Sequence, residues 1–285
     1  MNINRRRRAL RTALVATAVA VATATVAGTA SAAGAAEAPV TPSFELYGVH
    51  KQTRELHMWY PGGNGGFTAE GPVADDFSDV ADIIVADNDN DGYGESEWTV
   101  YKDGRLDFWG PGAGSIDTDT VGRGWNIYTT VLSPGSIGGA GQADLLGVDK
   151  AGVLWSYLSY PDGRLTTRTR VGGGWNAYSQ IAGQGDLTGD GKADVVARDK
   201  TGVLWLYKGT GDYKAPFGGR AKIGGGWNTY DRVLSTGDVD LDGKADLLGR
   251  KPDGKLFRYS GTGSASGLFK APVQINSGLQ NFNLF

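Results

Sequence analysis

The chain has 285 residues, no cysteine and a formal net charge of −3. Without cysteine no disulfide can stabilise it, so a domain of this size depends on a buried core and on any metal it binds. The lack of a basic surplus argues against a nucleic-acid partner, because gripping phosphates requires clustered lysine and arginine.

The N-terminal segment has the order of a secretory signal peptide. Arginines at 5–8 precede an apolar run over about 13–28, and small residues follow at 30–32. We expect a signal peptide over 1–32, cleaved after Ala32, and secretion into the extracellular space. No second apolar run of about 20 residues occurs, so no membrane span is expected after cleavage. The cleaved segment has five arginines and no acids, which leaves 23 basic and 31 acidic residues and a net charge of −8.

Residues 33–43 are rich in alanine and have no periodicity, so they are expected to form a flexible leader. A repeat of about fifty residues then fills 44–285. One marker of the repeat is a hairpin that ends in an aromatic residue, at Tyr60, Trp109, Tyr157, Tyr207 and Tyr259. A second is a Gly-Trp-Asn sequence centred on Trp125, Trp175 and Trp227, whose place is taken by Phe77 and Leu279 in the other two copies. The repeats are predicted at about 44–90, 91–139, 140–189, 190–241 and 242–285.

Each repeat contains four short alternating segments, which in the fourth copy are 194–198, 203–207, 220–223 and 227–234. Four antiparallel strands in about fifty residues form one blade of a β-propeller, and a blade can bury its faces only between neighbours. We therefore predict an all-β fold, a five-bladed β-propeller of four-stranded antiparallel blades over 44–285. It is expected to be a monomer.

Three acidic loops recur at one phase of the repeat. Each places oxygen-bearing side chains at alternate positions, then a glycine, then a closing carboxylate, which suits the six to eight oxygen ligands of Ca²⁺. The predicted ligands are Asp87, Asp89, Asp91 and Glu95 in one loop, Asp186, Thr188, Asp190 and Asp194 in the next, and Asp238, Asp240, Asp242 and Asp246 in the last. The alternative is an acidic, solvated turn without metal.

Calcium is expected to be structural, because the ligands come from a single turn and imply no cleft for a substrate. The corresponding turn of the third repeat keeps only Asp144 of the acidic pattern, and the first repeat offers only Glu37 and Glu45. Those two turns are expected to bind no metal.

Residues 87–95, 186–217 and 238–270 resemble FG-GAP/VCBS repeats through the acidic loop, the Ala-Asp-Leu-Leu type of strand and Phe217-Gly218-Gly219. This resemblance implies calcium, export and interaction with a partner. The whole repeated region is also similar to tachylectin, a five-bladed lectin, in its Gly-Gly-Gly-Trp-Asn motif and its number of repeats. That similarity implies amino-sugar ligands between blades, although tachylectin lacks the acidic loops.

Two interpretations of the Gly-Trp-Asn motif remain open. For a lectin, the tryptophan faces would stack on sugar rings while the asparagines hydrogen-bond to hydroxyl or acetamido groups, and repeated sites would add avidity. Alternatively each tryptophan packs between blades and each asparagine caps a turn. The candidate ligand-binding residues are Trp125, Asn126, Trp175, Asn176, Trp227 and Asn228. The partner is expected to be an extracellular glycan or cell-surface polysaccharide, or else a protein bound by adhesion without sugar.

The sequence favours a protein that is not an enzyme. It has no cysteine nucleophile and no Gly-x-Ser-x-Gly motif, and its two histidines offer no nucleophile and base pair. A five-bladed glycoside hydrolase is the remaining catalytic alternative, because such enzymes use paired carboxylates. Its candidates are Asp75, Asp76, Asp79 and Asp82, or else Asp117 and Asp119.

Overall fold

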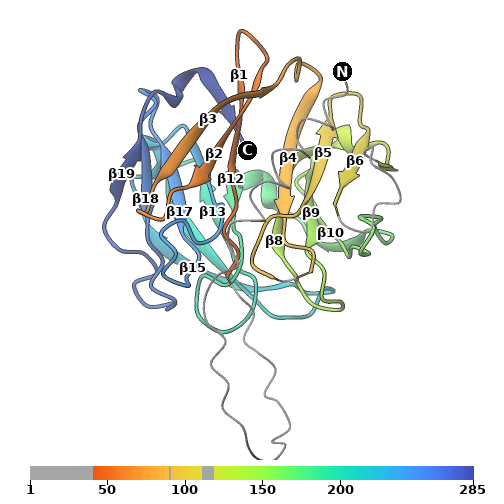
Figure 1. The fold of residues 1–285 in the computed structure, drawn as a ribbon. Helices are drawn as coiled ribbons and strands as arrows, with labels where there is room; N and C mark the ends of the chain where they lie inside the picture. The colour runs from red at the N-terminus through yellow and green to blue at the C-terminus, as the bar shows by residue number, and fades with distance from the viewer. Residues whose placement is uncertain (1–40, 90, 111–118) are drawn as a thin grey trace, which may run out of the picture.

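The structure is a computed structural model that describes residues 41–89, 91–110 and 119–285. The predicted signal peptide and most of the leader lie outside the described residues. Within them, twenty strands form five four-stranded antiparallel sheets, which confirms the predicted five-bladed β-propeller (Figure 1). Among these residues no helix is both long and apolar enough to cross a membrane.

Each sheet is one blade, numbered here in chain order, and the first blade borrows its innermost strand from the C-terminus. Blade 1 contains β1 (Leu46–His50), β2 (Leu56–Pro61), β3 (Phe67–Ala74) and β20 (Phe282–Leu284), and blade 2 contains β4 (Val80–Ala86), β5 (Ser96–Tyr101), β6 (Leu106–Trp109) and β7 (Asp119–Gly122). Blade 3 contains β8 (Tyr128–Gly135), β9 (Asp144–Asp149), β10 (Leu154–Tyr157) and β11 (Thr169–Gly172), and blade 4 contains β12 (Tyr178–Ala182), β13 (Val195–Asp199), β14 (Leu204–Gly209) and β15 (Phe217–Gly224). Blade 5 contains β16 (Arg232–Leu234), β17 (Leu247–Arg250), β18 (Leu256–Tyr259) and β19 (Val273–Asn276).

In blades 2–5 the hairpin between the second and third strands of the blade has a glycine in the left-handed region. In blade 4 the turn between β13 and β14 places Gly202 at φ 85°, where other L-residues are strained. The Asp199 carboxylate accepts hydrogen bonds from the backbone N–H groups of Thr201 and Val203, at 2.9 and 3.0 Å. This local chemistry explains why the Asp-x-x-Gly hairpin was recognisable in the sequence.

The ring is closed by five hydrophobic clusters, one between each pair of neighbouring blades. Blades 1 and 2 share Tyr47, Met58 and Val80, blades 2 and 3 share Trp98, Trp125 and Leu145, blades 3 and 4 share Leu154, Trp175 and Val195, blades 4 and 5 share Leu204, Trp227 and Leu247, and blades 5 and 1 share Leu248, Leu46 and Trp59. No blade has its own core, so each depends on its neighbours for apolar burial.

The first and last strands meet in blade 1. Strand β20 pairs with β1 in the register Gly48↔Leu284, Val49↔Asn283 and His50↔Phe282. In Figure 1 the orange strands β1–β3 accordingly lie beside the blue strands β17–β19. The last strand of the chain therefore completes the first blade rather than the fifth.

The blades are offset from the predicted repeats for the same reason. The segment predicted as the fourth strand of repeat four, 227–234, forms the 3₁₀ turn η3 (Trp227–Thr229) and then β16, which belongs to blade 5. The equivalent turns are η1 (Trp125–Ile127), η2 (Trp175–Ala177) and η4 (Leu279–Asn281). Each repeat thus supplies three strands to one blade and the innermost strand to the next.

The fold begins earlier than Phe44. Within the predicted leader, Thr41 Oγ1 donates to the carbonyl oxygen of Gly243 at 2.8 Å, and the carbonyl of Pro42 accepts from the N–H of Asp238 at 2.7 Å. The N–H of Ser43 donates to Gly92 O at 3.1 Å. Residues 41–43 are therefore held by the propeller.

Candidate functional site

The three acidic segments occupy equivalent places in blades 2, 4 and 5. Loop 1 (87–95) joins β4 to β5, loop 2 (186–194) joins β12 to β13, and loop 3 (238–246) joins β16 to β17. Each therefore connects the innermost strand of its blade to the second strand. The residues 41–44 lie between loops 1 and 3, because they bond to Gly92 of one and to Asp238 and Gly243 of the other. The loops gather at one end of the propeller.

Loop 1 brings all four of its predicted ligands together. One oxygen from each of Asp87, Asp89, Asp91 and Glu95 lies within 4.8 Å of the others. Backbone N–H groups curl the loop around Asp87, whose carboxylate accepts from Asp91 at 3.1 Å and from Gly92 at 2.8 Å. Glu95 Oε2 is buried and has no hydrogen-bond partner among the described residues.

Loop 2 brings together Asp186, Asp190 and Asp194 within the same 4.8 Å. Thr188 is 7% exposed, and its Oγ1 makes no hydrogen bond of regular geometry within the described part of the chain. Asp186 accepts backbone hydrogen bonds from Thr188 and Gly189 at 2.9 and 2.7 Å, which fixes its carboxylate inside the turn. The loop thus offers three carboxylates and one hydroxyl.

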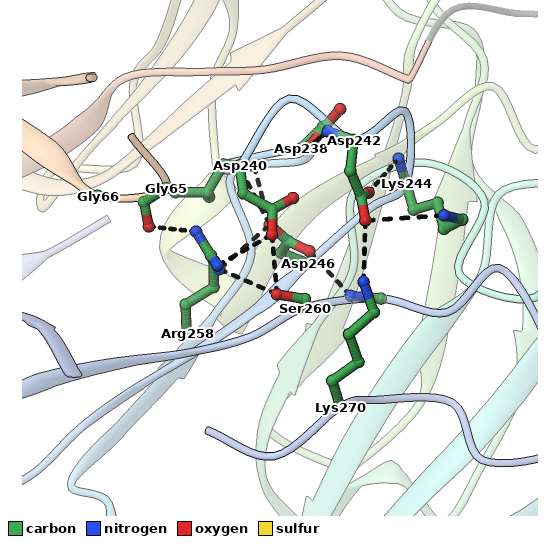
Figure 2. A network of polar contacts seen from close by, with 12 residues as sticks. Gly65, Gly66, Asp238, Asp240, Asp242, Lys244, Asp246, Arg258, Ser260 and Lys270 are labelled. Carbon is green, nitrogen blue, oxygen red and sulfur yellow. Dashed lines mark hydrogen bonds and ion pairs between the residues drawn. The ribbon is translucent and has the colours of Figure 1, made fainter. Parts of the chain in front are cut away.

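Loop 3 differs from the prediction at one ligand. Asp238, Asp240 and Asp246 cluster, but Asp242 lies outside the cluster and forms ion pairs with Lys270 at 3.1 Å and Lys244 at 3.7 Å (Figure 2). The attraction of two lysines accounts for its position. In this structure Asp242 therefore lies apart from the other three predicted ligands of loop 3.

A buried arginine also neutralises part of loop 3. Arg258 Nη2 lies 2.9 Å from Asp240 Oδ2, and Arg258 also donates to the carbonyl of Gly65 in blade 1 (Figure 2). The other oxygen, Asp240 Oδ1, is buried without a hydrogen-bond partner among the described residues. In loop 1, Asp89, Asp91 and Glu95 form no ion pair with a described lysine or arginine, whereas loop 2 has the pair Asp190–Lys208 at 3.0 Å.

The electrostatics favour a bound cation. Burial raises the pKa of Glu95 and of Asp194, and it raises the pKa of Asp246 to about 6. Neighbouring carboxylates add to each shift, such as Asp89 beside Glu95 and Asp240 beside Asp246. Several carboxylates held this close repel one another, and a divalent ion would reverse that repulsion.

The donor sets fit Ca²⁺. All the available side-chain ligands are hard oxygens, each loop has one buried oxygen that no described protein group satisfies, and the loops curl tightly enough to leave backbone carbonyls for further ligation. Loops 1 and 2 offer four side-chain ligands each, and loop 3 offers three. The residues that would hold the ion are therefore those predicted, with the exception of Asp242.

The closing carboxylate has a second role that the sequence analysis missed. Asp194 Oδ1 accepts from the N–H of Gly209 at 2.7 Å, and Asp246 Oδ1 accepts from Gly261 at 2.9 Å. Asp144, in the third repeat, makes the same contact with Ser159 at 3.0 Å although its turn lacks the other acids. This residue ties the loop to the third strand of its blade in all three places. The retention of Asp144 was the signal that could have revealed it.

Asp144 provides a pH prediction. It is fully buried, and burial raises its pKa from 3.8 to about 7, against the opposing effect of N–H bonds from Ile137 and Ser159. Because the folded pKa lies above the unfolded one, its contribution to stability is complete below about pH 4 and is lost as the pH rises through 7. NMR titration of the Asp144 carboxyl carbon should show a midpoint near 7. Exposed Asp253 is the comparison, because its hydrogen bond and ion pair with Lys255 lower its pKa below 3.8. A midpoint near 4 for Asp144 would contradict this.

The tryptophans of the Gly-Trp-Asn motif are part of the core. Trp125, Trp175 and Trp227 are 5%, 8% and 7% exposed, and the centroids of the last two rings lie 4.7 Å from those of Tyr207 and Tyr259. The sugar-stacking interpretation of their faces is therefore wrong, because those faces are covered between the blades. The alternative, in which the tryptophans pack between blades, is the one the structure supports.

The motif also fastens one hairpin to the next innermost strand. The backbone N–H of each tryptophan donates to the carbonyl of a hairpin glycine, as Trp175 does to Gly152 at 2.9 Å. The asparagines that follow are exposed and lie over this glycine, where a Cβ on Gly152 would meet Asn176 within 2.6 Å. Asn126 and Asn228 sit over Gly104 and Gly202 in the same way. Their surroundings are those of residues that cover a turn.

This arrangement predicts a large difference between neighbouring residues. Trp175→Ala should lower the free energy of unfolding by about 3–5 kcal/mol, because it removes a buried aromatic side chain and leaves a cavity. Asn176→Ala, at an exposed site, should change it by no more than about 1 kcal/mol. Urea unfolding in saturating calcium measures both. Equal effects would mean that the tryptophan is not a core residue.

A cavity of about 380 Å³ lies between blades 4 and 5. Its lining includes Trp227, Tyr259 and Phe269, with Lys222 and Lys270 among its polar residues. One tryptophan of the motif, Trp227, thus lines a space large enough for a small ligand.

The aspartates of the hydrolase alternative do not share one environment: Asp117 lies outside the described residues, and Asp119 begins the outermost strand β7. Asp75, Asp76 and Asp79 are exposed, and Asp76 accepts a hydrogen bond from Ser78 at 2.7 Å. Asp82 instead lines a cavity among the innermost strands. The two histidines, His50 and His57, pack together and against Phe282, and burial lowers the pKa of His57.

Residues 186–249 match the family described as an FG-GAP-like repeat. The matched stretch begins with loop 2 and ends in β17, so it covers one full repeat of the propeller and loop 3. The sequence shows no match among curated proteins. The chain is thus a five-bladed β-propeller in which residues 186–249 match an FG-GAP-like repeat.

Several solved structures are similar at low identity. Human WBSCR16 is 11% identical with a TM-score of 0.38, over 85% of this chain and 65% of that chain. Prp20p from Saccharomyces cerevisiae is 12% identical with a TM-score of 0.38, over 79% and 59%. A protein of unknown function from Bacteroides caccae is 10% identical with a TM-score of 0.37, over 82% and 73%. The chain therefore spans less than two thirds of the length of the first two.

Proposed function

We propose that this propeller is an exported, calcium-stabilised binding module without catalytic activity. The observation that carries the proposal is the clustering of three or four oxygen ligands in each of three equivalent loops, each with a buried oxygen that no described group satisfies. FG-GAP-like repeats on a propeller support a binding or interaction module as the class of function.

Calcium, when bound, would supply the positive charge that these carboxylates lack. The chain itself prepares the loops, because backbone N–H groups hold Asp87, Asp186 and Asp238 in place before an ion arrives. Residues 41–44 join loops 1 and 3, so rigidity gained in one loop is passed to the other through main-chain bonds. The metal is therefore assigned a structural role.

A protein partner is favoured by exposed apolar side chains beside these loops. Tyr93 in loop 1 is 63% exposed and Leu241 in loop 3 is 58% exposed. Tyr160 is 48% exposed, and its neighbour Pro161 accepts a hydrogen bond from Asn88 of loop 1 at 3.2 Å. Exposed large side chains gathered at one end of a domain suit a protein interface. Calcium would fix the positions of Tyr93 and Leu241.

A glycan partner is the second candidate, and the cavity between blades 4 and 5 is the observation that favours it. Amino sugars there would contact Trp227 and Tyr259, which both line the cavity. The stoichiometry of sugar binding is therefore informative. One sugar per chain would indicate this cavity alone, and a higher number would indicate equivalent sites in other repeats.

Calorimetric titration of the protein over 33–285 tests both parts. Calcium added to chelator-treated protein should give saturable heat with a stoichiometry near three, and no heat would overturn the calcium assignment. N-acetylglucosamine and its oligomers, titrated with and without calcium, test the glycan candidate. Saturable sugar binding would favour a lectin, and its absence would leave the protein partner.

A further inference from the structure

The innermost strands of the propeller surround a cavity of about 220 Å³ on the ring axis. Its walls come from β4, β8, β12 and β16, and Phe285 after β20 also lines it. At roughly 30 Å³ per water molecule this volume holds about seven waters, which is also the size of a small metabolite. Neither the acidic loops nor the cavity between blades 4 and 5 involves this space.

One level of the cavity carries a belt of polar side chains. Asp82, Thr130, Gln180 and Arg232 occupy the same position of β4, β8, β12 and β16, since each pairs at the equivalent register with the second strand of its blade. All four line the cavity. The repeat has thus placed a carboxylate, a hydroxyl, an amide and a guanidinium in one ring.

Two members of the belt are charged, and they do not neutralise each other directly. Asp82 and Arg232 interact electrostatically, but they form no ion pair, and Arg232 makes no side-chain hydrogen bond to any described residue. Arg232 Nε is buried without a partner in the described part of the chain. A guanidinium has five N–H donors, so leaving it unpaired inside a protein is costly. Burial accordingly lowers the pKa of Arg232 and raises that of Asp82 to about 6.

The remaining members are already committed to the protein or are neutral. Gln180 donates from Nε2 to Asp231 O at 2.8 Å and accepts at Oε1 from the N–H of Val233 at 2.6 Å, so its amide joins blade 4 to blade 5. This contact fixes the strand on which Arg232 lies. Arg232 Nε thus lacks an acceptor, while Asp82 accepts the backbone N–H of Ile83 at 3.1 Å and, as a carboxylate, can accept further donors.

The belt lies in a part of the cavity that solvent reaches, and Phe44 lines the cavity toward the acidic loops. Asp82 and Arg232 are both partly exposed, whereas Phe44 lines the opposite end at 3% exposure and donates its N–H to Thr236 O at 2.8 Å. Near Phe44, Gln184 Oε1 and Thr236 Oγ1 are buried without partners among the described residues. The lining therefore contains more hydrogen-bonding capacity than the protein satisfies.

From this arrangement we propose that the axial cavity binds one small zwitterion, of the class of free α-amino acids, with its carboxylate on Arg232 and its ammonium group on Asp82. A zwitterion pairs both charges without adding net charge to the cavity. The Thr130 hydroxyl stands at the same level as a further hydrogen-bonding group. This inference is independent of the calcium assignment and of the partner of the loop end.

Calorimetry of the full mature chain, in calcium so that the loops are held constant, tests the proposal. Glycine, serine and glutamate are the probes, and acetate and methylammonium are the matching half-molecules. At least one amino acid should bind saturably with one site per chain, and about tenfold or more tighter than acetate, because acetate leaves Asp82 without its donor. Absence of saturable binding, or acetate binding as tightly as every amino acid, would overturn the proposal and leave a water-filled channel.

Arg232→Gln and Asp82→Asn should each weaken amino-acid binding at least about tenfold. The control is Arg123→Gln, which removes an exposed arginine that does not line the cavity and should leave the affinity unchanged. Without ligand, Arg232→Gln should raise the melting temperature by roughly 2–4 °C, because it removes an unpaired buried charge. Unchanged affinity in this variant, or a lowered melting temperature without ligand, would show that Arg232 is structural and would overturn the proposal.

Discussion

Replacing one carboxylate in each of loops 1 and 2, by Asp89→Ala and Asp190→Ala together, should remove most of the calcium-induced stabilisation that these loops provide. At a calcium concentration 100 times the dissociation constant, one site adds about 2.7 kcal/mol. In a domain of this size that corresponds to roughly 5–10 °C of melting temperature per site. Differential scanning fluorimetry in calcium and in chelator measures the difference directly.

These two residues suit the test because they contribute little else. Both are exposed, and each accepts a single backbone hydrogen bond at 3.2 Å, from Asp91 and from Lys192. Their removal should therefore leave the melting temperature in chelator nearly unchanged, and it should even relieve some repulsion. The double variant should respond to calcium only through loop 3.

The matched control is Asp253→Ala. Asp253 is an exposed turn residue that also accepts one backbone hydrogen bond at 3.2 Å, from Lys255, and forms an ion pair as Asp190 does with Lys208. It lies in no acidic cluster among the described residues. This variant should keep the full calcium response. If the double variant keeps it as well, loops 1 and 2 do not bind the ion.

Deleting residues 282–285 should unfold the propeller or reduce it to a molten state. The deletion removes β20, the innermost strand of blade 1, with its three paired positions on β1. Leu284 is 3% exposed in the cluster between blades 5 and 1, and the ring of Phe282 lies 5.1 Å from that of Trp59. Arg250 Nη1, which donates to Phe282 O at 2.6 Å, would lose that acceptor.

The size of the effect follows from these contacts. Burying one leucine and one phenylalanine contributes about 1.5–3 kcal/mol each, and each strand hydrogen bond adds about 0.5–1.5 kcal/mol. The sum approaches the whole stability of a typical domain, about 5–15 kcal/mol. Circular dichroism near 280 nm, which reports packed aromatic rings, should lose its signal.

Adding the missing strand back provides the control. A peptide with residues 278–285, supplied in excess, should restore the aromatic signal, because the groove beside β1 is specific for this sequence. A scrambled peptide of the same composition should not restore it. A truncated protein that melts at the original temperature without peptide would contradict the assignment of β20 as the closing strand.

The sequence alone was sufficient for the class of fold and for most of the loop ligands. The fold class depends on local features, namely the period of about fifty residues, the hairpin glycines and the four alternating segments per repeat. Such features can be predicted from sequence because they depend on residues that are neighbours in the chain. The alternate oxygens of the acidic loops are equally local, so ten of their acidic side chains and Thr188 could be placed correctly before any contact was known.

Features that depend on which surfaces meet could be decided only by the tertiary structure. The sequence does not predict that the last strand belongs to the first blade, because the pairing of Gly48 with Leu284 joins residues that are more than 200 positions apart. The sequence also left open whether Trp125, Trp175 and Trp227 face solvent, since tryptophan occurs both in ligand-binding surfaces and in cores. In the structure the neighbouring blades cover these three side chains, so they belong to the core. The Asp242 side chain lies outside the carboxylate cluster of loop 3 because it forms an ion pair with Lys270, which is 28 residues away in the sequence. The axial belt of Asp82 and Arg232 likewise exists only once the ring closes, because only closure brings the innermost strands around one cavity.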